Sequence, residues 1–252
     1  MGGVRAWAQA FLICLLPTPA VRWMVNLMGS RIERGARVGF SLLVAEKIVL
    51  RRGARIGHLN FFRISRIVML QETRVKHLNL VRGPFSFELE KGAIFSSLNR
   101  MVRNPIGITI GSSRFRMNPH SGVTSGHYFD LTRPIRIGRH SIIAGIDCQL
   151  WTHGYVHDTE GSGRYRIDGG IDIGPNVYVG SRVLISLGVT IERGVVVGAG
   201  CVVASNLEAE SLYVSAKLRK LSRPIDPDER AELIAAARGD SLDRVYFRRK
   251  HR

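Results

Sequence analysis

The sequence has few cysteines, and none of them forms a pattern. Cys14, Cys148 and Cys201 are the three in 252 residues, and no two have the spacing of a metal-binding pair. This usage excludes a cysteine-based metal site and indicates a reducing, cytoplasmic setting.

Acidic residues are also scarce, with 20 Asp and Glu against 37 Lys and Arg, a net charge of +17. That charge favours anionic partners: nucleic acid, acidic lipid headgroups or a phosphate-bearing small molecule. No helix-turn-helix, zinc-finger or RNP-type pattern is present, and the cations are not interleaved with aromatics, which argues against nucleic acid. A hydrophobic share of 45% is enough for a continuous core, and 23% charged residues argue against wholesale disorder.

No apolar run is long enough to cross a membrane. The most apolar stretch, residues 4–28, holds an uninterrupted run of only seven residues, bracketed by Gln9 and Pro17, whereas a spanning helix needs about 20. A secretory signal is disfavoured, because no clean small-x-small cleavage site follows the apolar run. We therefore expect residues 1–30 to form a helical segment that caps the fold or makes peripheral membrane contact, with Trp7 and Trp23 near the interface.

The strongest positive signal is a six-residue period between Ile173 and Leu207. Aliphatic residues recur in two phases, listed as Ile173, Val179, Ile185, Ile191, Val197 and Val203, and Val177, Val183, Val189, Val195, Cys201 and Leu207. Six is the period neither of a helix nor of an alternating strand. It predicts a hexapeptide β-helix, in which short strands alternate with turns and equivalent positions stack.

The same period recurs earlier, at Ile32, Val38, Val44, Leu50 and Ile56, then at Met69, Val75, Val81 and Phe87, and again at Leu131, Ile137, Ile143 and Gln149. We therefore expect a repeat domain over residues 31–207, with irregular loops between about 83 and 127, where prolines and glycines gather. The basic residues between the core positions should face solvent: Arg51, Arg52, Arg55, Arg63, Arg66, Arg74 and Lys76.

Two segments do not fit the repeat. Residues 154–170 are too polar and too rich in glycine for a coil, and we expect a loop excluded from the solenoid, which in a compact fold is often functional. Residues 208–252 contain a basic run, an alanine-rich helix predicted over Asp228–Arg238 that would cap the open end, and a cationic tail.

The segment from Asp130 to about Arg223 resembles the hexapeptide-repeat acyltransferases, in particular the galactoside, maltose and colanic-acid O-acetyltransferase group. The residues that carry the resemblance are Ile137-Gly138, Trp151-Thr152-His153-Gly154, Ile171 to Ser181, Leu187 to Ile191 and Val197 to Val203. The resemblance covers close to two fifths of the chain. It implies a mainly β fold, a left-handed parallel β-helix, and a homotrimer with active sites between subunits.

The resemblance implies that His153 is the catalytic base of an O-acetyltransferase that uses acetyl-CoA and no metal. A sugar hydroxyl attacks a thioester poorly until a base takes its proton, and imidazole is suited to that task near neutral pH. Asp130 falls near the position at which the family carries an acidic group that contacts the acceptor.

The resemblance also implies a coenzyme site. Ser181, Ala199, Ala204 and Ser205 match positions along which the pantetheine arm lies, and Lys217, Arg219 and Lys220 match the basic segment that meets the CoA phosphates. The family usually has a Gly-x-Pro-Ala turn before those bases. Here the sequence is Val214-Ser215-Ala216-Lys217, without the proline.

Several alternatives remain open. A zinc enzyme like the γ-carbonic anhydrases would need three histidines on one metal, from the set His120, His127, His140, His153 and His157. A non-catalytic basic scaffold is another. Within acyl transfer, the acceptor could be an amine, as in sugar N-acetylation, or serine. The apolar N-terminus and basic surface favour a carbohydrate acceptor: a surface polysaccharide, a lipopolysaccharide or its lipid-linked precursor at the inner face of the membrane.

Overall fold

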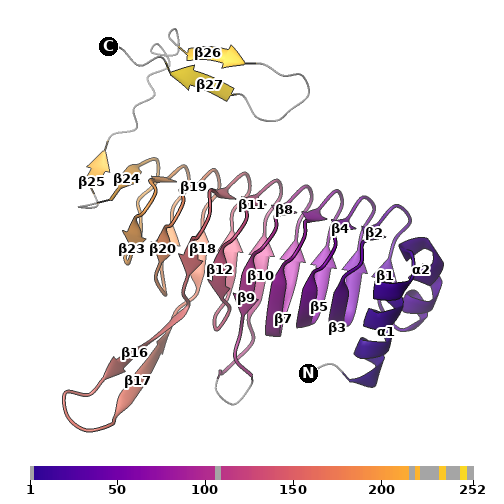
Figure 1. Cartoon of the computed structure of the whole chain (residues 1–252). Coiled ribbons are helices and arrows are strands. Elements are labelled where there is room, and N and C mark those ends of the chain that lie inside the picture. The colour runs from indigo at the N-terminus through magenta and orange to yellow at the C-terminus, as the bar shows by residue number, and fades with distance from the viewer. Residues whose placement is uncertain (1–2, 106–108, 216–218, 222–232, 237–244, 249–252) are drawn as a thin grey trace. The chain divides into compact units, whose positions relative to one another are not determined.

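A computed structural model describes residues 3–105, 109–215, 219–221, 233–236 and 245–248. The chain divides into two compact units, Met1–Lys220 and Leu221–Arg252. In the first unit, two helices are followed by parallel strands that coil through about nine turns of a β-solenoid (Figure 1). The mainly β solenoid predicted from the six-residue period is confirmed.

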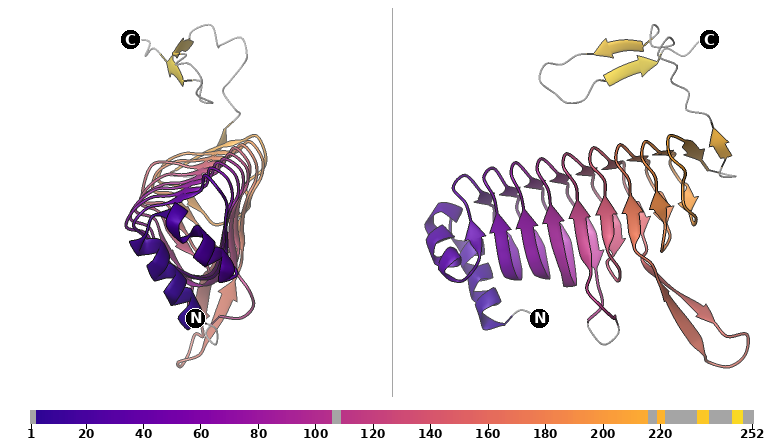
Figure 2. Two further views of the ribbon diagram at one scale, coloured as in Figure 1. Left: turned by 90° about the vertical axis from the view of Figure 1, so that its right-hand side faces the viewer. Right: turned by 180° about the vertical axis from the view of Figure 1, so that it is seen from behind.

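The solenoid has three sides, which are plain when it is viewed along its axis (Figure 2, left). One side contains β1 (Arg31–Ile32), the later halves of β3 (Leu42–Leu50), β5 (Phe61–Met69) and β7 (Leu80–Leu89), then β10 (Arg114–Met117), β13 (Ile135–Ile137), β18 (Ile171–Ile173) and β21 (Thr190–Ile191). The next contains β2 (Arg37–Val38), β4 (Arg55–Ile56), β6 (Arg74–Val75), β8 (Ile94–Phe95), β11 (Gly122–Val123), β14 (Ile142–Ile143), β19 (Tyr178–Val179), β22 (Val196–Val197) and β24 (Leu212–Val214). The third contains the earlier halves of β3, β5 and β7, then β9 (Arg100–Val102), β12 (Tyr128–Asp130), β15 (Gln149–Leu150), β20 (Leu184–Ile185) and β23 (Val202–Val203).

Equivalent residues of successive turns stack in the interior and form the core. The twelve aliphatic and cysteine positions predicted between Ile173 and Leu207 are all buried. Nearer the middle, five phenylalanine rings pack together in the interior, mostly edge to face: Phe62, Phe87, Phe95, Phe115 and Phe129. Tight corners need glycine where coils approach closely, and a Cβ on Gly138 would collide with the backbone of Gly174.

The predicted register is wrong at two positions, where it slips by one residue. Leu43 points into the core in place of Val44, which instead packs under the first helix, and Leu150 is buried whereas Gln149 is exposed. The early turns are longer than the later ones: Leu50 pairs with Met69, whereas Ile173 pairs with Ile191. A step of six residues cannot follow nineteen-residue turns without drifting, and each one-residue slip exchanges the two faces of a strand.

The N-terminal segment forms helices α1 (Val4–Leu15) and α2 (Thr18–Leu27). Pro17 separates them, because the residue before a proline is disfavoured in the helical conformation. Ile13, Val21 and Val25 join the core of the first turn, so the segment does cap the solenoid. Among the described residues, no helix is long and apolar enough to cross a membrane.

A hairpin leaves the solenoid between β15 and β18. Within residues 154–170, for which an excluded loop is predicted, most of the chain belongs to an antiparallel hairpin of β16 (His153–His157) and β17 (Arg164–Asp168) that projects from the body (Figure 1). Residues 103–105 and 109–113 lie between β9 and β10, outside both strands. The irregular loops expected between about 83 and 127 are otherwise replaced by regular solenoid strands. The prolines fit this regular structure, because Pro84 lies where β7 bends around a corner and Pro119 lies in a turn.

The C-terminal boundary also differs from the prediction. The solenoid continues beyond Leu207 to β24, which pairs with β22, and Tyr213 fills a core position. β25 (Arg219–Leu221) follows in the same sheet. Of the helix predicted over Asp228–Arg238, the described part is strand β26 (Leu233–Ala236), which pairs with β27 (Val245–Arg248), so backbone pairing overrides alanine's helix preference; the remainder lies outside the described residues.

Candidate active site

His153 and Asp130, the two predicted catalytic residues, lie together at one corner of the solenoid. Asp130 ends β12 and His153 begins β16, which follows β15. β12 and β15 are paired in register, Phe129 opposite Leu150, so the residues that follow them stack at the same corner. One turn of the solenoid thus joins two side chains that are 23 residues apart in sequence.

The Asp130 carboxylate is buried and is held by several donors. Oδ2 lies 2.7 Å from His153 Nδ1 and accepts the Thr152 backbone N–H at 2.9 Å. Oδ1 accepts the hydroxyl of Thr132 at 2.9 Å. The Thr152 hydroxyl lies 2.8 Å from Oδ2 and accepts the backbone N–H of Arg133. The carboxylate is therefore fixed in place and orients the imidazole.

These contacts favour the ionised form of Asp130. Burial raises the pKa of Asp130, but hydrogen bonds from His153, Thr152 and Thr132 outweigh it and hold that pKa below its ordinary value. An ionised carboxylate can only accept hydrogen bonds, so the imidazole proton lies on Nδ1. Nε2 then carries the lone pair of the neutral ring, and among the described residues it has no protein partner. The imidazole is set to accept a proton at Nε2.

A row of aromatic rings borders the pair. Tyr128 packs on Trp151 with ring centroids 4.9 Å apart, and His153 lies between Trp151 at 6.3 Å and Tyr155 at 6.0 Å. Burial, with a contribution from Asp130, raises the pKa of Tyr128, so its hydroxyl stays protonated. The rings are tilted or edge-on to one another, and the row is partly exposed.

Three arginines belong to the same neighbourhood. Arg103 is buried and donates to the carbonyl oxygens of Pro84 at 2.6 Å and Gly111 at 2.5 Å. Burial lowers its pKa, and the nearby charges of Arg133 and Arg166 lower it further. Asp130 and Asp168 offset part of this repulsion. The corner therefore carries an excess of positive charge.

The predicted coenzyme positions are divided between two corners. Ser181 and Ala199 follow β19 and β22 and stack on neighbouring turns, and the Gly200 N–H donates to the Ser181 carbonyl at 2.9 Å. Ala204 and Ser205 follow β23, at the same corner as His153 but further along the axis. Ala199, Ala204 and Ser205 are exposed, and Ser181 is half-buried.

The predicted phosphate-binding cations are only partly described. Arg219 and Lys220 belong to β25, and Lys217 lies outside the described residues.

The histidines considered as zinc ligands are spread over the molecule. His120 and His140 stack on each other, with ring centroids 5.3 Å apart. His127 is buried and accepts a hydrogen bond from the Cys148 backbone N–H, and His157 is the last residue of β16. Across the described ranges, no three His, Cys, Asp or Glu side chains come together as a metal site.

Sequence reasoning missed the residues that support the pair. Thr152 lies inside the segment that carries the family resemblance, yet its carboxylate contacts were not predicted, and neither were those of Thr132. Threonine at a solenoid corner is common, so only the position directly before His153 could have marked Thr152 as a supporting residue.

No protein-family model matches the chain, and no curated protein matches its sequence. Solved structures do match its fold. The polySia-specific acetyltransferase NeuO has a TM-score of 0.54 at 18% identity, covering 82% of this chain and 89% of its own. LpxA from Acinetobacter baumannii has 0.52 at 12% identity, covering 76% and 71%. A mutant of the N-acyltransferase AntD from Bacillus cereus, in complex with dTDP-4-amino-4,6-dideoxyglucose and coenzyme A, has 0.51 at 15%, covering 68% and 88%. The chain has the fold of hexapeptide-repeat acyltransferases, which confirms the expected architecture.

Proposed function

We propose that this protein is an O-acetyltransferase that moves an acetyl group from acetyl-CoA to a hydroxyl of a carbohydrate. The observation that carries the proposal is the Asp130–His153 pair, with Nδ1 held by an ionised carboxylate and Nε2 without a protein partner among the described residues. The fold supports the same chemistry, because two of the similar structures, NeuO and AntD, are described as an acetyltransferase and an N-acyltransferase.

In the proposed reaction, Nε2 of His153 takes the proton of the acceptor hydroxyl while its oxygen attacks the thioester carbonyl. The tetrahedral intermediate collapses, the carbon–sulfur bond breaks, and the CoA thiolate receives the proton from the imidazolium. Asp130 stabilises that imidazolium and keeps the ring in one tautomer. A positioned general base of this kind contributes roughly 10²–10⁴-fold in rate.

The coenzyme would lie along the corners that carry Ser181, Ala199, Ala204 and Ser205, where short side chains leave the backbone accessible. Cations of the segment Lys217–Lys220 would meet its phosphates. Backbone N–H groups of a neighbouring chain in a homotrimer would hold the oxyanion.

Two observations support the nature of the acceptor. The aromatic row beside His153 suits the apolar face of a sugar ring, since ligand sites combine aromatic surfaces with a few polar groups. Arg133 is half-buried at this corner, and its charge suits an anionic group on that acceptor. We propose a surface polysaccharide, a lipopolysaccharide or a lipid-linked precursor, acetylated in the cytoplasm.

An amino sugar is the second candidate acceptor. The complex of AntD with an amino-sugar nucleotide favours it, and His153 could equally take the proton of an attacking amine.

The test is calorimetric titration with CoA at two salt concentrations, followed by a screen of carbohydrate acceptors with acetyl-CoA. We expect saturable CoA binding that survives the higher salt, and turnover that falls at least about 100-fold in His153→Ala while CoA binding and the unfolding midpoint stay unchanged. Loss of all CoA binding at the higher salt, or full turnover by His153→Ala, would contradict the proposal.

A further inference from the structure

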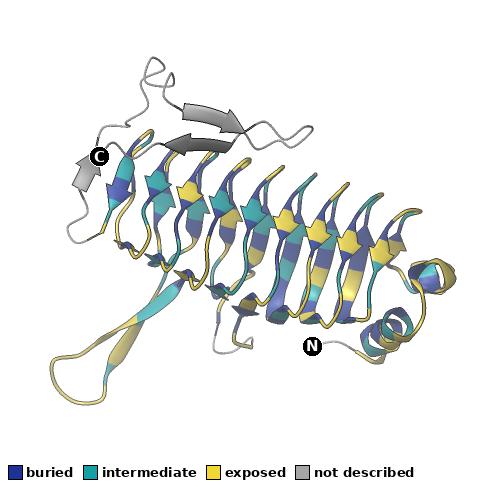
Figure 3. Cartoon of the chain, turned by 45° about the horizontal axis from the view of Figure 1, so that its top comes forward, coloured by how far each residue is buried: buried dark blue, intermediate teal, exposed yellow. Residues whose placement is uncertain are grey.

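Helix α1 is apolar on two opposite faces. Its inner face, with Ala6, Ala10 and Ile13, packs on the first turn of the solenoid. Its outer face continues from Val4 to Leu15, which are 89% and 70% exposed, with Phe11 between them. Figure 3 colours the ribbon by burial, with exposed residues in yellow. A helix in contact with water normally has a polar outer face, so this stripe requires a partner.

Helix α2 repeats the arrangement. Val21 and Val25 are buried, whereas Trp23 and Leu27 are 70% and 69% exposed on the other side. Between residues 3 and 28 the chain has no acidic residue, and its charges are Arg5 and Arg22. The unpartnered surface of both helices is thus apolar and cationic.

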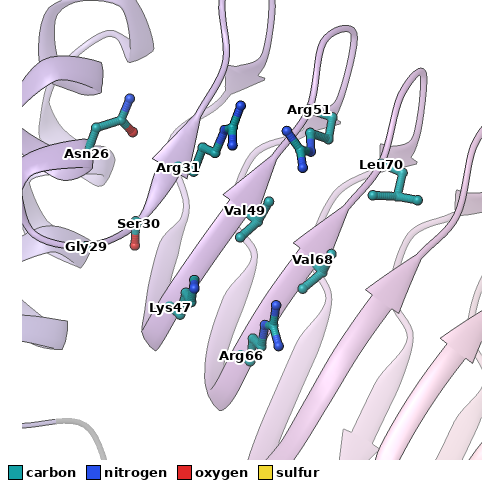
Figure 4. A pocket seen from close by; sticks show the side chains of 10 residues that line it. All are labelled: Asn26, Gly29, Ser30, Arg31, Lys47, Val49, Arg51, Arg66, Val68 and Leu70. Carbon is teal, nitrogen blue, oxygen red and sulfur yellow. The ribbon is translucent and has the colours of Figure 1, made fainter.

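A basic groove of about 510 Å³ lies beside the helices (Figure 4). Asn26, Gly29 and Ser30 form its wall at the end of α2. The rest is lined by four cations and three apolar residues: Arg31, Lys47, Arg51, Arg66, Val49, Val68 and Leu70. Ser30 also donates to Gln9 of α1 at 3.0 Å, so a buried hydrogen bond ties α1 to the residue that follows Gly29 in the groove wall.

The charges in this groove are incompletely compensated. Glu33 pairs with Arg31 and Arg51. Lys47 and Arg66 lie opposite each other on neighbouring strands, and in the described part of the chain neither forms an ion pair. Like charges in that position destabilise a sheet unless an anion joins them.

We propose that α1, α2 and the basic groove bind the surface of an anionic phospholipid bilayer. The exposed side chains of both helices enter the boundary between headgroups and acyl chains, and the groove receives lipid phosphates. A second copy of this chain fits less well, because a symmetric contact would bring two cationic surfaces together.

The test is co-sedimentation of the full chain with vesicles of phosphatidylcholine alone and of phosphatidylcholine mixed with phosphatidylglycerol. We expect partition to the mixed vesicles, and a loss of at least tenfold in the double variant Phe11→Ser, Leu15→Ser, which leaves the net charge unchanged. The matched control is Leu78→Asn, Leu98→Asn. It removes two exposed leucines elsewhere, at positive φ angles that asparagine tolerates, and should bind like the wild type.

A second pair of variants tests the groove. Lys47→Gln, Arg66→Gln should weaken partition several-fold more than Lys91→Gln, Arg139→Gln, which removes the same charge from exposed positions outside the groove. The proposal fails if the Phe11, Leu15 variant partitions like the wild type, or if no binding to anionic vesicles occurs. Loss of self-association in that variant, without vesicle binding by the wild type, would assign the stripe to a second copy.

Discussion

Asp130 acts through His153, and its contribution can be measured separately from that of the base. In Asp130→Asn the amide offers one acceptor oxygen and one NH2 donor to a site that supplies donors from Thr132, Thr152 and His153. The NH2 group must face at least one of these donors, so the imidazole loses its fixed tautomer. We expect kcat to fall at least about 100-fold, with little change in the KM for acetyl-CoA.

Steady-state kinetics in both substrates measures this effect, and the unfolding midpoint controls for structural damage. Equal rates for Asp130→Asn and the wild type would remove Asp130 from the mechanism.

His127 is a residue whose titration should control acid stability. It is buried, and its Nδ1 accepts the Cys148 backbone N–H at 3.1 Å while Nε2 lies 2.9 Å from the Thr124 hydroxyl. Burial lowers its pKa from 6.5 to about 4, so between those values the unfolded chain binds a proton that the native chain does not. Stability is therefore complete above about pH 6.5 and declines toward pH 4, by about 3 kcal/mol.

Chemical unfolding at a series of pH values should show this slope in the wild type. His127→Gln cannot titrate, so its free energy of unfolding should be lower at neutral pH but nearly flat between about pH 6.5 and 4. The lowered pKa of Asp130 places its own contribution at more acidic pH, where it is lost as the carboxylate protonates. An unchanged slope in His127→Gln would assign acid sensitivity to other groups.

At the scale of elements, a polar ladder runs inside one corner of the solenoid. Asn60, Asn79 and Asn99 are buried on successive turns, and each side-chain oxygen accepts the backbone N–H of the next rung: Asn79 at 3.0 Å, Asn99 at 3.0 Å and His127 at 2.9 Å. The ladder fixes the register of consecutive turns, because a slip would leave buried donors without acceptors.

Asn79→Ala breaks this ladder at its centre. The Asn99 N–H would be buried without an acceptor, which costs about 1–3 kcal/mol of unfolding free energy. The control is Asn206→Ala, because Asn206 is exposed and water can replace its bond to the Thr190 N–H. Urea unfolding of both variants tests the prediction, and equal losses would contradict it.

The elements differ in how far their sequence predicts them. Between Ile173 and Val203 the turns have eighteen residues, so a six-residue step stays in phase and every predicted core position there is buried. Leu207 is buried as well, although it pairs with Ile191 across a shorter turn of sixteen residues. Near Val44 and Gln149 the turns are longer, and the phase slips. A six-residue period in the sequence therefore identifies core residues only where successive turns have the same length. The ladder asparagines recur at nineteen or twenty residues, a spacing that a six-residue window cannot detect.

The active site, too, could be predicted only in part from the local sequence. His153 could be predicted because it follows a core position and opens the excluded segment. Its contact with Asp130 depends on two strands being stacked in register, which the local sequence does not encode. The supporting threonines depend on that stacking as well, so they emerge only in three dimensions.

For the whole molecule, the corner location of the site leads to a prediction about assembly. His153 and the aromatic row lie on an outer corner of a single solenoid, so one chain offers the reactants a base and a stacking surface on one side. Effective catalysis requires both reactants to be held in a near-attack geometry and shielded from water. A neighbouring chain against this corner would supply the opposite wall, as the proposed homotrimer requires.

We therefore expect sedimentation equilibrium to give three times the mass of one chain, and specific activity to fall when dilution dissociates the assembly. Coexpression with an excess of His153→Ala chains provides the control. If each site uses the His153 of one chain, mixed trimers should retain activity in proportion to the wild-type chains they contain. A fully active monomer at the highest dilution would overturn the shared-site arrangement while leaving the Asp130–His153 chemistry intact.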